Sequence, residues 1–214
     1  MWSGPNNNIF MDQNTYKNII TGYNIDNEQF DIQLGGGEPL LHPQFFDYVD
    51  FACTQPLIKT VIIDTNGVIL DDYIKTLFRL SQKYHKTIIL KISVNYSLIE
   101  QDPSYLQKLQ KWSKNYPNSD FWILCLSIRH RTPQSLDEPW LDELINNNYY
   151  GYAHNFHPIE FTGRAKQNKV KGTVLSGDID PKGCISCVYA CDGTYFATDF
   201  DARMDYEKTL SNEQ

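Results

Sequence analysis

Three consecutive glycines followed by Glu-Pro are the residues of this sequence best suited to binding a small molecule. They lie in the segment QLGGGEPLLHP, directly after a strand-like stretch at residues 30–34. Glycine lacks a Cβ atom, so it adopts positive φ angles and lets a ligand approach main-chain N–H and C=O groups closely. We interpret the segment as a binding loop, and the alternative is a tight turn whose proline opens the next helix. The loop residues are Gly35, Gly36, Gly37, Glu38 and Pro39.

A cluster of cysteines is the second candidate site. Cys184, Cys187 and Cys191 form a C-x2-C-x3-C pattern late in the chain. Three thiolates this close together can converge on zinc or an iron–sulfur cluster, although a closed structural site needs a fourth ligand. The alternative is three free thiols, which are common in a reduced cytoplasm. The candidates for a fourth ligand are Asp192, His154, His157 and Cys53.

Two histidines and two further cysteines are expected to have structural rather than ligand-binding roles. His154 and His157 are separated by Asn-Phe and followed by Pro158, a pattern that indicates a loop with surface histidines. Cys53 and Cys125 fall on the apolar faces of a predicted helix and a predicted strand. We therefore expect both cysteines to pack in the core.

Apolar runs alternate with helical patterns along the chain, which predicts repeated βα units around a parallel sheet. The near-continuous apolar run at residues 60–64 is typical of a strand buried on both faces. Strands are expected at 30–34, 60–64, 87–94, 121–128 and 149–154, and helices at about 43–54, 71–84, 103–115 and 136–146. A hairpin with Asp-Gly as its turn is expected at residues 191–196.

Polar or glycine-rich residues lie at or directly after the end of each of the first four predicted strands. The glycine loop follows the first, and the others carry Thr65 and Asn66, Ser93 and Asn95, and Arg129 and His130. Parallel α/β sheets and barrels place their ligand sites at the carboxyl ends of the strands. We therefore expect one shared ligand pocket at this edge.

Taken together, these motifs resemble the radical S-adenosylmethionine enzymes. The chain has GGE-P after one strand, TNG after the next, a serine in the strand after that, and a late Gly-Arg-Ala at residues 163–165. The resemblance runs from about Trp2 to Lys166. It implies a partial (β/α) TIM-type barrel, here with its first strand missing or truncated, over residues 1–170. Residues 171–214 would then form a small cysteine-bearing C-terminal extension, in which some family members carry an auxiliary cluster.

The resemblance also implies roles for individual residues. Gly36, Gly37 and Glu38 would bind the amino group at the methionine end of S-adenosylmethionine, and Gly35 and Pro39 would shape the loop. Ser93 and Asn95 would contact the ribose or carboxylate of the cofactor, with Thr65 and Asn66 near the same pocket. Arg164 would reach a cofactor carboxylate or fix the barrel rim.

The sequence departs from the family at the cluster motif. Family members bind a 4Fe-4S cluster through C-x3-C-x2-C after their first strand, whereas this sequence has no cysteine before Cys53. We expect either a truncated enzyme or a relative that has lost the cluster, and no radical chemistry from this chain alone. The intact enzyme would cleave S-adenosylmethionine reductively to modify an unknown substrate, for which a peptide is one candidate. The alternatives are a non-catalytic ligand-binding or partner protein and a zinc-stabilised α/β protein.

Composition limits the partners. The 214 residues carry a formal charge of −7, which argues against nucleic acid or an anionic membrane as the main partner. The N-terminal residues lack the pattern of a signal peptide, so we expect a cytoplasmic protein. A barrel without its first strand would expose a sheet edge, which predicts a homo-oligomer. Light scattering that found a monomer at high concentration would count against this prediction.

Overall fold

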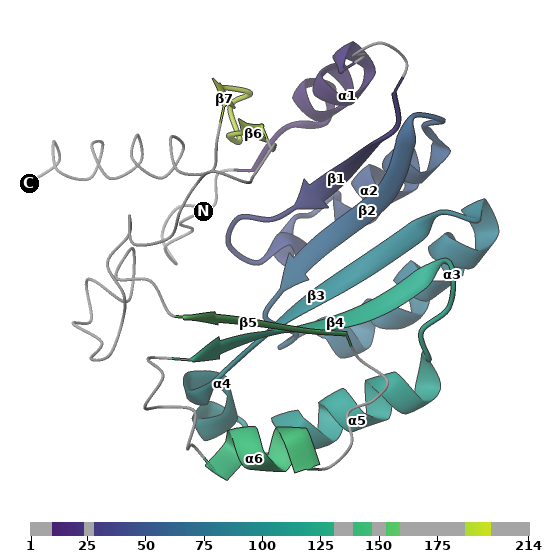
Figure 1. Ribbon diagram of the computed structural model, residues 1–214. Coiled ribbons are helices and arrows are strands. Elements are labelled where there is room, and N and C mark those ends of the chain that lie inside the picture. Colours follow the sequence, from purple (N-terminus) through teal and green to yellow (C-terminus); the bar gives the residue numbers. More distant parts are fainter. Residues whose placement is uncertain (1–9, 24–27, 131–138, 147–152, 159–186, 198–214) are drawn as a thin grey trace, which may run out of the picture.

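Five parallel β-strands form the centre of the protein (Figure 1). The computed structural model describes residues 10–23, 28–130, 139–146, 153–158 and 187–197. The sheet has the order β1-β2-β3-β4-β5, so each strand pairs with its neighbour along the chain. The strands are β1 (Phe30–Leu34), β2 (Ile58–Thr65), β3 (Thr87–Asn95), β4 (Trp122–His130) and β5 (Ala153–Pro158).

Helices connect the strands, and a small hairpin follows late in the chain. The α-helices are α1 (Gln13–Gly22), α2 (Phe45–Thr54), α3 (Ile74–Tyr84), α4 (Tyr96–Gln101), α5 (Tyr105–Asn115) and α6 (Pro139–Asn146). Two short 3₁₀ helices, η1 (Pro39–Leu41) and η2 (Leu70–Asp72), follow β1 and β2. The hairpin consists of β6 (Val188–Tyr189) and β7 (Tyr195–Phe196).

The apolar core lies between one face of the sheet and the helices. Crossovers between parallel strands are right-handed, so a sequential strand order brings successive helices to the same face. Figure 1 shows α2 and α3 behind the sheet on that side. Strand β3 alternates strictly, with Ile88, Leu90, Ile92 and Val94 buried and the residues between them half-buried. The second face of β3 is therefore more polar and less enclosed.

Amphipathic helices complete the core. Helix α3 buries Ile74 and Leu77, while α5 buries its residues at the spacing of about 3.6 that places side chains on one helical face. The buried residues of α5 are Tyr105, Leu106, Leu109 and Trp112. This packing fixes α5 against the ends of β2 and β3, where the candidate site lies.

The mixed α/β architecture confirms the predicted α/β class with parallel strands. Strand β1 has the predicted bounds, and β2 and β3 extend the predicted strands by one or two residues at their ends. Strand β4 begins one residue later and ends two residues later than predicted. Of the strand expected at 149–154, only residues 153 and 154 are described, and they belong to β5, which continues to Pro158 and pairs with β4. Helices α1 and α4 were not predicted. Within the described ranges the sheet is open, with β1 and β5 at its edges.

The described helices include none that is both long and apolar enough to span a membrane.

Candidate functional site

The glycine loop and the TNG loop are joined by the carboxylate of Glu38. Its Oε1 atom accepts a hydrogen bond from the Thr65 hydroxyl at 2.8 Å and a longer one from the Leu40 N–H at 3.2 Å. Its Oε2 atom accepts the N–H of Asn66 at 2.8 Å. Glu38 is also the N-cap of η1. One side chain therefore holds the loop after β1, the loop after β2 and the start of the following helix together.

The glycine loop presents bare backbone. Gly36 has a φ of +127°, which L-residues rarely adopt, and a Cβ placed there would meet no atom within 4 Å. Among the described residues, Gly36 and Gly37 make no hydrogen bond through N–H or C=O. A Cβ on Gly35 would lie 3.5 Å from Oδ2 of Asp64. The loop thus has space above it and unpaired polar groups, as a ligand-binding loop requires.

Burial and hydrogen bonding act in opposite directions on Glu38. Burial raises the pKa of its carboxyl group, while the hydrogen bonds from Asn66, Thr65 and Leu40 lower it, and the net shift is upward. A carboxylate has about four acceptor positions, and three are used here. One position on Oε2 therefore remains for a donor from a ligand.

The TNG loop is supported from behind by Tyr105 on α5. The Tyr105 hydroxyl lies 2.7 Å from the carbonyl oxygen of Asn66 and 3.2 Å from that of Ser93. Gly67 has a φ of +72°, and a Cβ there would lie 2.9 Å from the Tyr105 oxygen. Only glycine allows this approach without displacing the tyrosine. Tyr105 connects the ends of β2 and β3, and a helical pattern in the sequence does not reveal that role.

The predicted residues after β3 are also near this edge. Asn95 is the N-cap of α4, where its Oδ1 atom accepts the N–H of Leu98 at 3.1 Å. The structure therefore brings together the glycine loop with Glu38, Thr65 and Asn66, and links Ser93 to them through Tyr105. Arg164 lies outside the described residues.

A polar row crosses the sheet face that points away from the helices. Asp64 accepts a hydrogen bond from Gln33, and its Oδ1 lies 3.4 Å from Nζ of Lys91. Lys91 is in register with Cys125 on β4. The expectation that Cys125 packs in the apolar core is wrong, because its half-buried thiol faces this row, whereas Cys53 is buried in the core as predicted.

The cysteine cluster is described only in part. Cys187 and Cys191 are free thiols, and Cys184 lies outside the described residues. Within the described ranges, no group of three His, Cys, Asp or Glu residues could hold a metal ion. The Asp-Gly sequence does lie in the hairpin connection, where Gly193 has a φ of +87°. The hairpin begins at Val188, however, before the predicted start.

The two histidines do not lie in a loop. His154 and His157 belong to β5, in register with Leu126 and Arg129 of β4. The loop interpretation is wrong because Pro158 closes an edge strand, a position at which a missing N–H costs no ladder bond.

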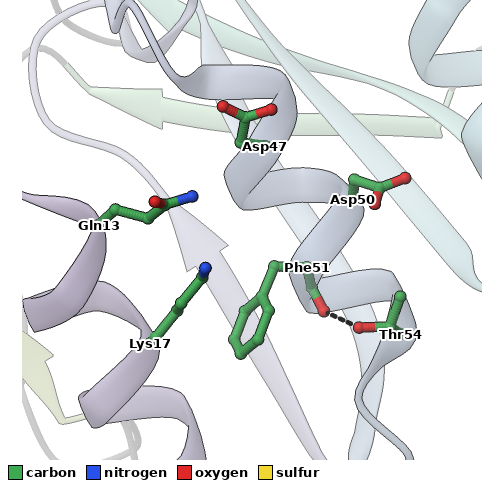
Figure 2. A pocket seen from close by; sticks show the side chains of 6 residues that line it. All are labelled: Gln13, Lys17, Asp47, Asp50, Phe51 and Thr54. Atoms are coloured by element: carbon green, nitrogen blue, oxygen red, sulfur yellow. Dashed lines mark hydrogen bonds between the residues drawn. The ribbon is translucent and has the colours of Figure 1, made fainter.

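Two shallow pockets lie beside the helices. Figure 2 shows one of about 370 Å³ between α1 and α2, where Lys17 approaches the ring of Phe51 at 5.4 Å from its centroid. Its lining residues are Gln13, Lys17, Asp47, Asp50, Phe51 and Thr54, and none belongs to the glycine or TNG loop. The other, of about 440 Å³, follows η1 and is lined by residues 41–47 with Asp72 and Tyr73. Neither encloses the polar groups described above.

Comparison with known proteins gives one short match. A segment of 40 residues is 55% identical to GTP 3',8-cyclase from Chlorobaculum tepidum, a radical S-adenosylmethionine enzyme. That segment is therefore similar to part of one radical S-adenosylmethionine enzyme. The match covers 19% of this chain and only 12% of the cyclase. No family model and no solved structure matches the chain.

Proposed function

We propose that this chain is the cofactor-binding part of a radical S-adenosylmethionine-type protein built on a partial (β/α) barrel. The observation that carries the proposal is the Glu38 carboxylate, which joins the glycine loop to Thr65 and Asn66 at the carboxyl ends of β1 and β2. The short similarity to a radical S-adenosylmethionine enzyme supports the same family.

The donors and acceptors of the loop suit the methionine end of S-adenosylmethionine. An ammonium group offers three N–H donors and no acceptor. The free acceptor position on Glu38 and the unpaired carbonyl groups of Gly36 and Gly37 are acceptors that can receive these N–H donors. The open space above Gly36 admits the ligand. We therefore assign the ammonium group to these three residues.

When bound and reduced by one electron, S-adenosylmethionine supplies hydrogen-abstraction chemistry. In the family an iron–sulfur cluster provides the electron, and its C-x3-C-x2-C ligands do not occur in this sequence. The described residues offer no substitute set of ligands. We propose that the 214-residue chain binds the cofactor without cleaving it, and that cleavage needs cluster ligands from a longer chain or a partner.

Calorimetric titration with S-adenosylmethionine tests the proposal. We expect saturable binding to the chain, competition by free methionine, and no release of 5'-deoxyadenosine after reduction with dithionite. Gly36→Ala should weaken binding about tenfold, because an alanine at a φ of +127° costs about 1–2 kcal/mol to hold in place. The matched control is Gly22→Ala, at the end of α1, where a Cβ meets nothing within 4 Å.

Two results would contradict the proposal. The first is a chain that binds neither S-adenosylmethionine nor methionine while its circular dichroism shows it to be folded. The second is a Gly36→Ala variant that binds as tightly as the Gly22→Ala control, since the cofactor would then lie elsewhere.

A further inference from the structure

The two shallow pockets beside α2 share one residue, Asp47. The larger pocket, of about 440 Å³, lies between the start of α2 and the residues that precede α3, and the smaller one, of about 370 Å³, lies between α1 and α2. Figure 2 shows the smaller pocket, with Gln13 and Lys17 extending from α1 toward α2. Because Asp47 lines both pockets, they form one continuous surface, which we call the α2 surface. None of its lining residues belongs to the proposed cofactor site.

Aromatic rings line the larger pocket. The rings of Phe46 and Tyr73 are stacked, with centroids 5.2 Å apart and an interplanar angle of 23°, and Phe45 meets Tyr73 edge-on at 6.1 Å. Phe45 is buried, whereas Phe46 and Tyr73 are half-buried and keep accessible ring surface. Leu41, in the same pocket, is 62% exposed and is the most exposed large apolar side chain that the structure describes. The larger pocket therefore offers aromatic and aliphatic surface to a partner.

The larger pocket also carries negative charge that no lining residue of the described structure neutralises. Asp47 and Asp72 are exposed, and neither carboxylate forms an ion pair within the described ranges. His42 is the other charge-bearing candidate in the lining, and both of its ring nitrogens are used inside the protein. Its Nδ1 accepts the N–H of Gln44 at 3.0 Å, as a neutral imidazole does, and its Nε2 lies 3.0 Å from the carbonyl oxygen of Met11. Two carboxylates thus remain available to a cation.

The charges of the smaller pocket are already partnered. Lys17 lies over the ring of Phe51, 5.4 Å from its centroid. Asp50 lies 3.5 Å from Nζ of Lys83 and accepts a hydrogen bond from the Tyr84 hydroxyl at 2.8 Å. The unpaired negative charge of the α2 surface is therefore concentrated in the larger pocket.

A guanidinium group on an aliphatic stem matches the larger pocket. The group is planar, so it stacks on an aromatic ring, and its N–H groups bind a carboxylate through two parallel hydrogen bonds. The methylene groups of an arginine side chain also cover apolar surface while the charged end stays near water. An ammonium group carries the same charge but has no planar face. The combination of ring surface and free carboxylates therefore favours arginine.

We propose that the α2 surface docks a polypeptide segment that places an arginine side chain in the larger pocket. Asp47 and Thr54 are seven residues apart on α2, which is about 10 Å along a helix axis. An extended chain covers this distance with roughly three or four residues, so one segment reaches both pockets. Shallow pockets arranged in this way cover a peptide better than a small molecule, which requires a more enclosed cavity. The proposal does not depend on the cofactor site.

Titration of the complete nitrogen-15-labelled chain, followed by two-dimensional NMR, tests the surface. The probe is the blocked peptide acetyl-Leu-Arg-Leu-Gln-amide, and its control has citrulline in place of arginine, which keeps the shape and removes the charge. We expect the arginine peptide to bind saturably at millimolar concentration and to shift the signals of residues 41–47 and 72–73. It should bind about tenfold more tightly than the citrulline peptide, because the carboxylates and the rings both favour the cation.

Asp72→Asn tests the acidic lining with little change in shape. The substitution should weaken binding of the arginine peptide about threefold to fivefold, as the loss of one exposed ion pair implies, and should leave binding of the citrulline peptide unchanged. Asp120→Asn is the matched control. Asp120 is also exposed, lies directly before β4 at the opposite end of the sheet, and changes the net charge of the chain by the same amount.

Several outcomes would overturn the proposal. Absence of binding, equal affinity for the arginine and citrulline peptides, or equal effects of Asp72→Asn and Asp120→Asn would remove the arginine pocket, the last by showing only a general attraction to an acidic chain. Free arginine that binds as tightly as the peptide would make the occupant a small molecule. Shifts at residues 41–47 when the chain alone is concentrated would identify a second copy as the occupant. Each of these results leaves binding of S-adenosylmethionine, and so the proposed function, untouched.

Discussion

Glu38 has both a structural role and a proposed ligand-binding role. Its carboxylate pairs with Thr65, Asn66 and Leu40 inside the protein, and it retains one acceptor position for a ligand. The internal bonds orient the carboxylate before any ligand arrives, so less entropy is lost on binding. A residue predicted only as a ligand contact is thus also the structural link between two loops.

Glu38→Gln should destabilise the protein by about 1–3 kcal/mol, because the amide NH₂ of glutamine would face an N–H or O–H donor in place of an acceptor. The effect should depend on pH in a direction set by the raised pKa of Glu38. A raised folded-state pKa means that the folded protein binds the proton more tightly, so this group's contribution to stability falls as pH rises from the unfolded value through the folded one. Urea denaturation of both proteins between pH 4 and neutrality measures the difference.

We expect the difference in unfolding free energy between the wild type and Glu38→Gln to be largest at the acidic end of this range. It should fall as the pH rises and then become constant. Glu28→Gln is the control, because Glu28 is an exposed glutamate. If this difference in unfolding free energy instead increased with pH, the effect of the hydrogen bonds on the pKa of Glu38 would outweigh the effect of burial.

The sequence predicted the residues of the two loops and their meeting at one edge, because both follow strands that point the same way. It did not predict the contacts of Tyr105 and Lys91 at this edge. Tyr105 lies on an outer helix, and its contact with the TNG loop depends on how that helix packs. The ion pair between Lys91 and Asp64 depends on strand register, which a single sequence does not fix.

Among the elements, helix α5 supports the candidate site through Tyr105, although the helix itself lies outside the two loops. Tyr105→Phe removes the hydroxyl that lies 2.7 Å from the carbonyl of Asn66 and 3.2 Å from that of Ser93. We expect a loss of about 1–2 kcal/mol in unfolding free energy and weaker binding of S-adenosylmethionine, since the ends of β2 and β3 lose their common support. Tyr116→Phe is the matched control, because that hydroxyl makes no hydrogen bond in the described structure. Equal effects of the two substitutions on cofactor affinity would contradict a positioning role for Tyr105.

Elements with strong apolar runs were predictable, and short polar ones were not. Helix α1 was missed because its sequence, QNTYKNIITG, is mostly polar, although Asp12 caps it through the N–H groups of Asn14 and Thr15. Helix α4 has six residues and begins at Asn95, a residue interpreted as a ligand contact. The later part of strand β5 was not predicted, because Asn155 and Pro158 are of residue types depleted in strands.

At the scale of the whole molecule, the late hairpin lies against the first helix. Figure 1 shows β6 and β7 beside α1. A Cβ on Gly193 would lie 3.0 Å from Cγ2 of Thr15, and the thiol of Cys187 interacts with the Tyr23 hydroxyl and raises its pKa. The hairpin that carries two of the clustered cysteines is therefore packed on a segment far away in the sequence. Access to Cys187 should depend on this contact.

Gly193→Val should loosen the hairpin, because its side chain would overlap Thr15 and because valine is strained at a φ of +87°. We expect Cys187 to react with N-ethylmaleimide about fivefold faster or more, as a loss of about 1 kcal/mol in local stability implies. Mass spectrometry resolves each cysteine, and buried Cys53 serves as the internal reference. Acceleration of Cys53 by the same factor would indicate global unfolding, and an unchanged rate at Cys187 would mean that the contact with α1 does not protect it. A faster reaction at the hairpin cysteines alone would show that packing on α1 limits their reactivity. No sequence motif indicates this contact, because α1 and the hairpin are far apart in the chain.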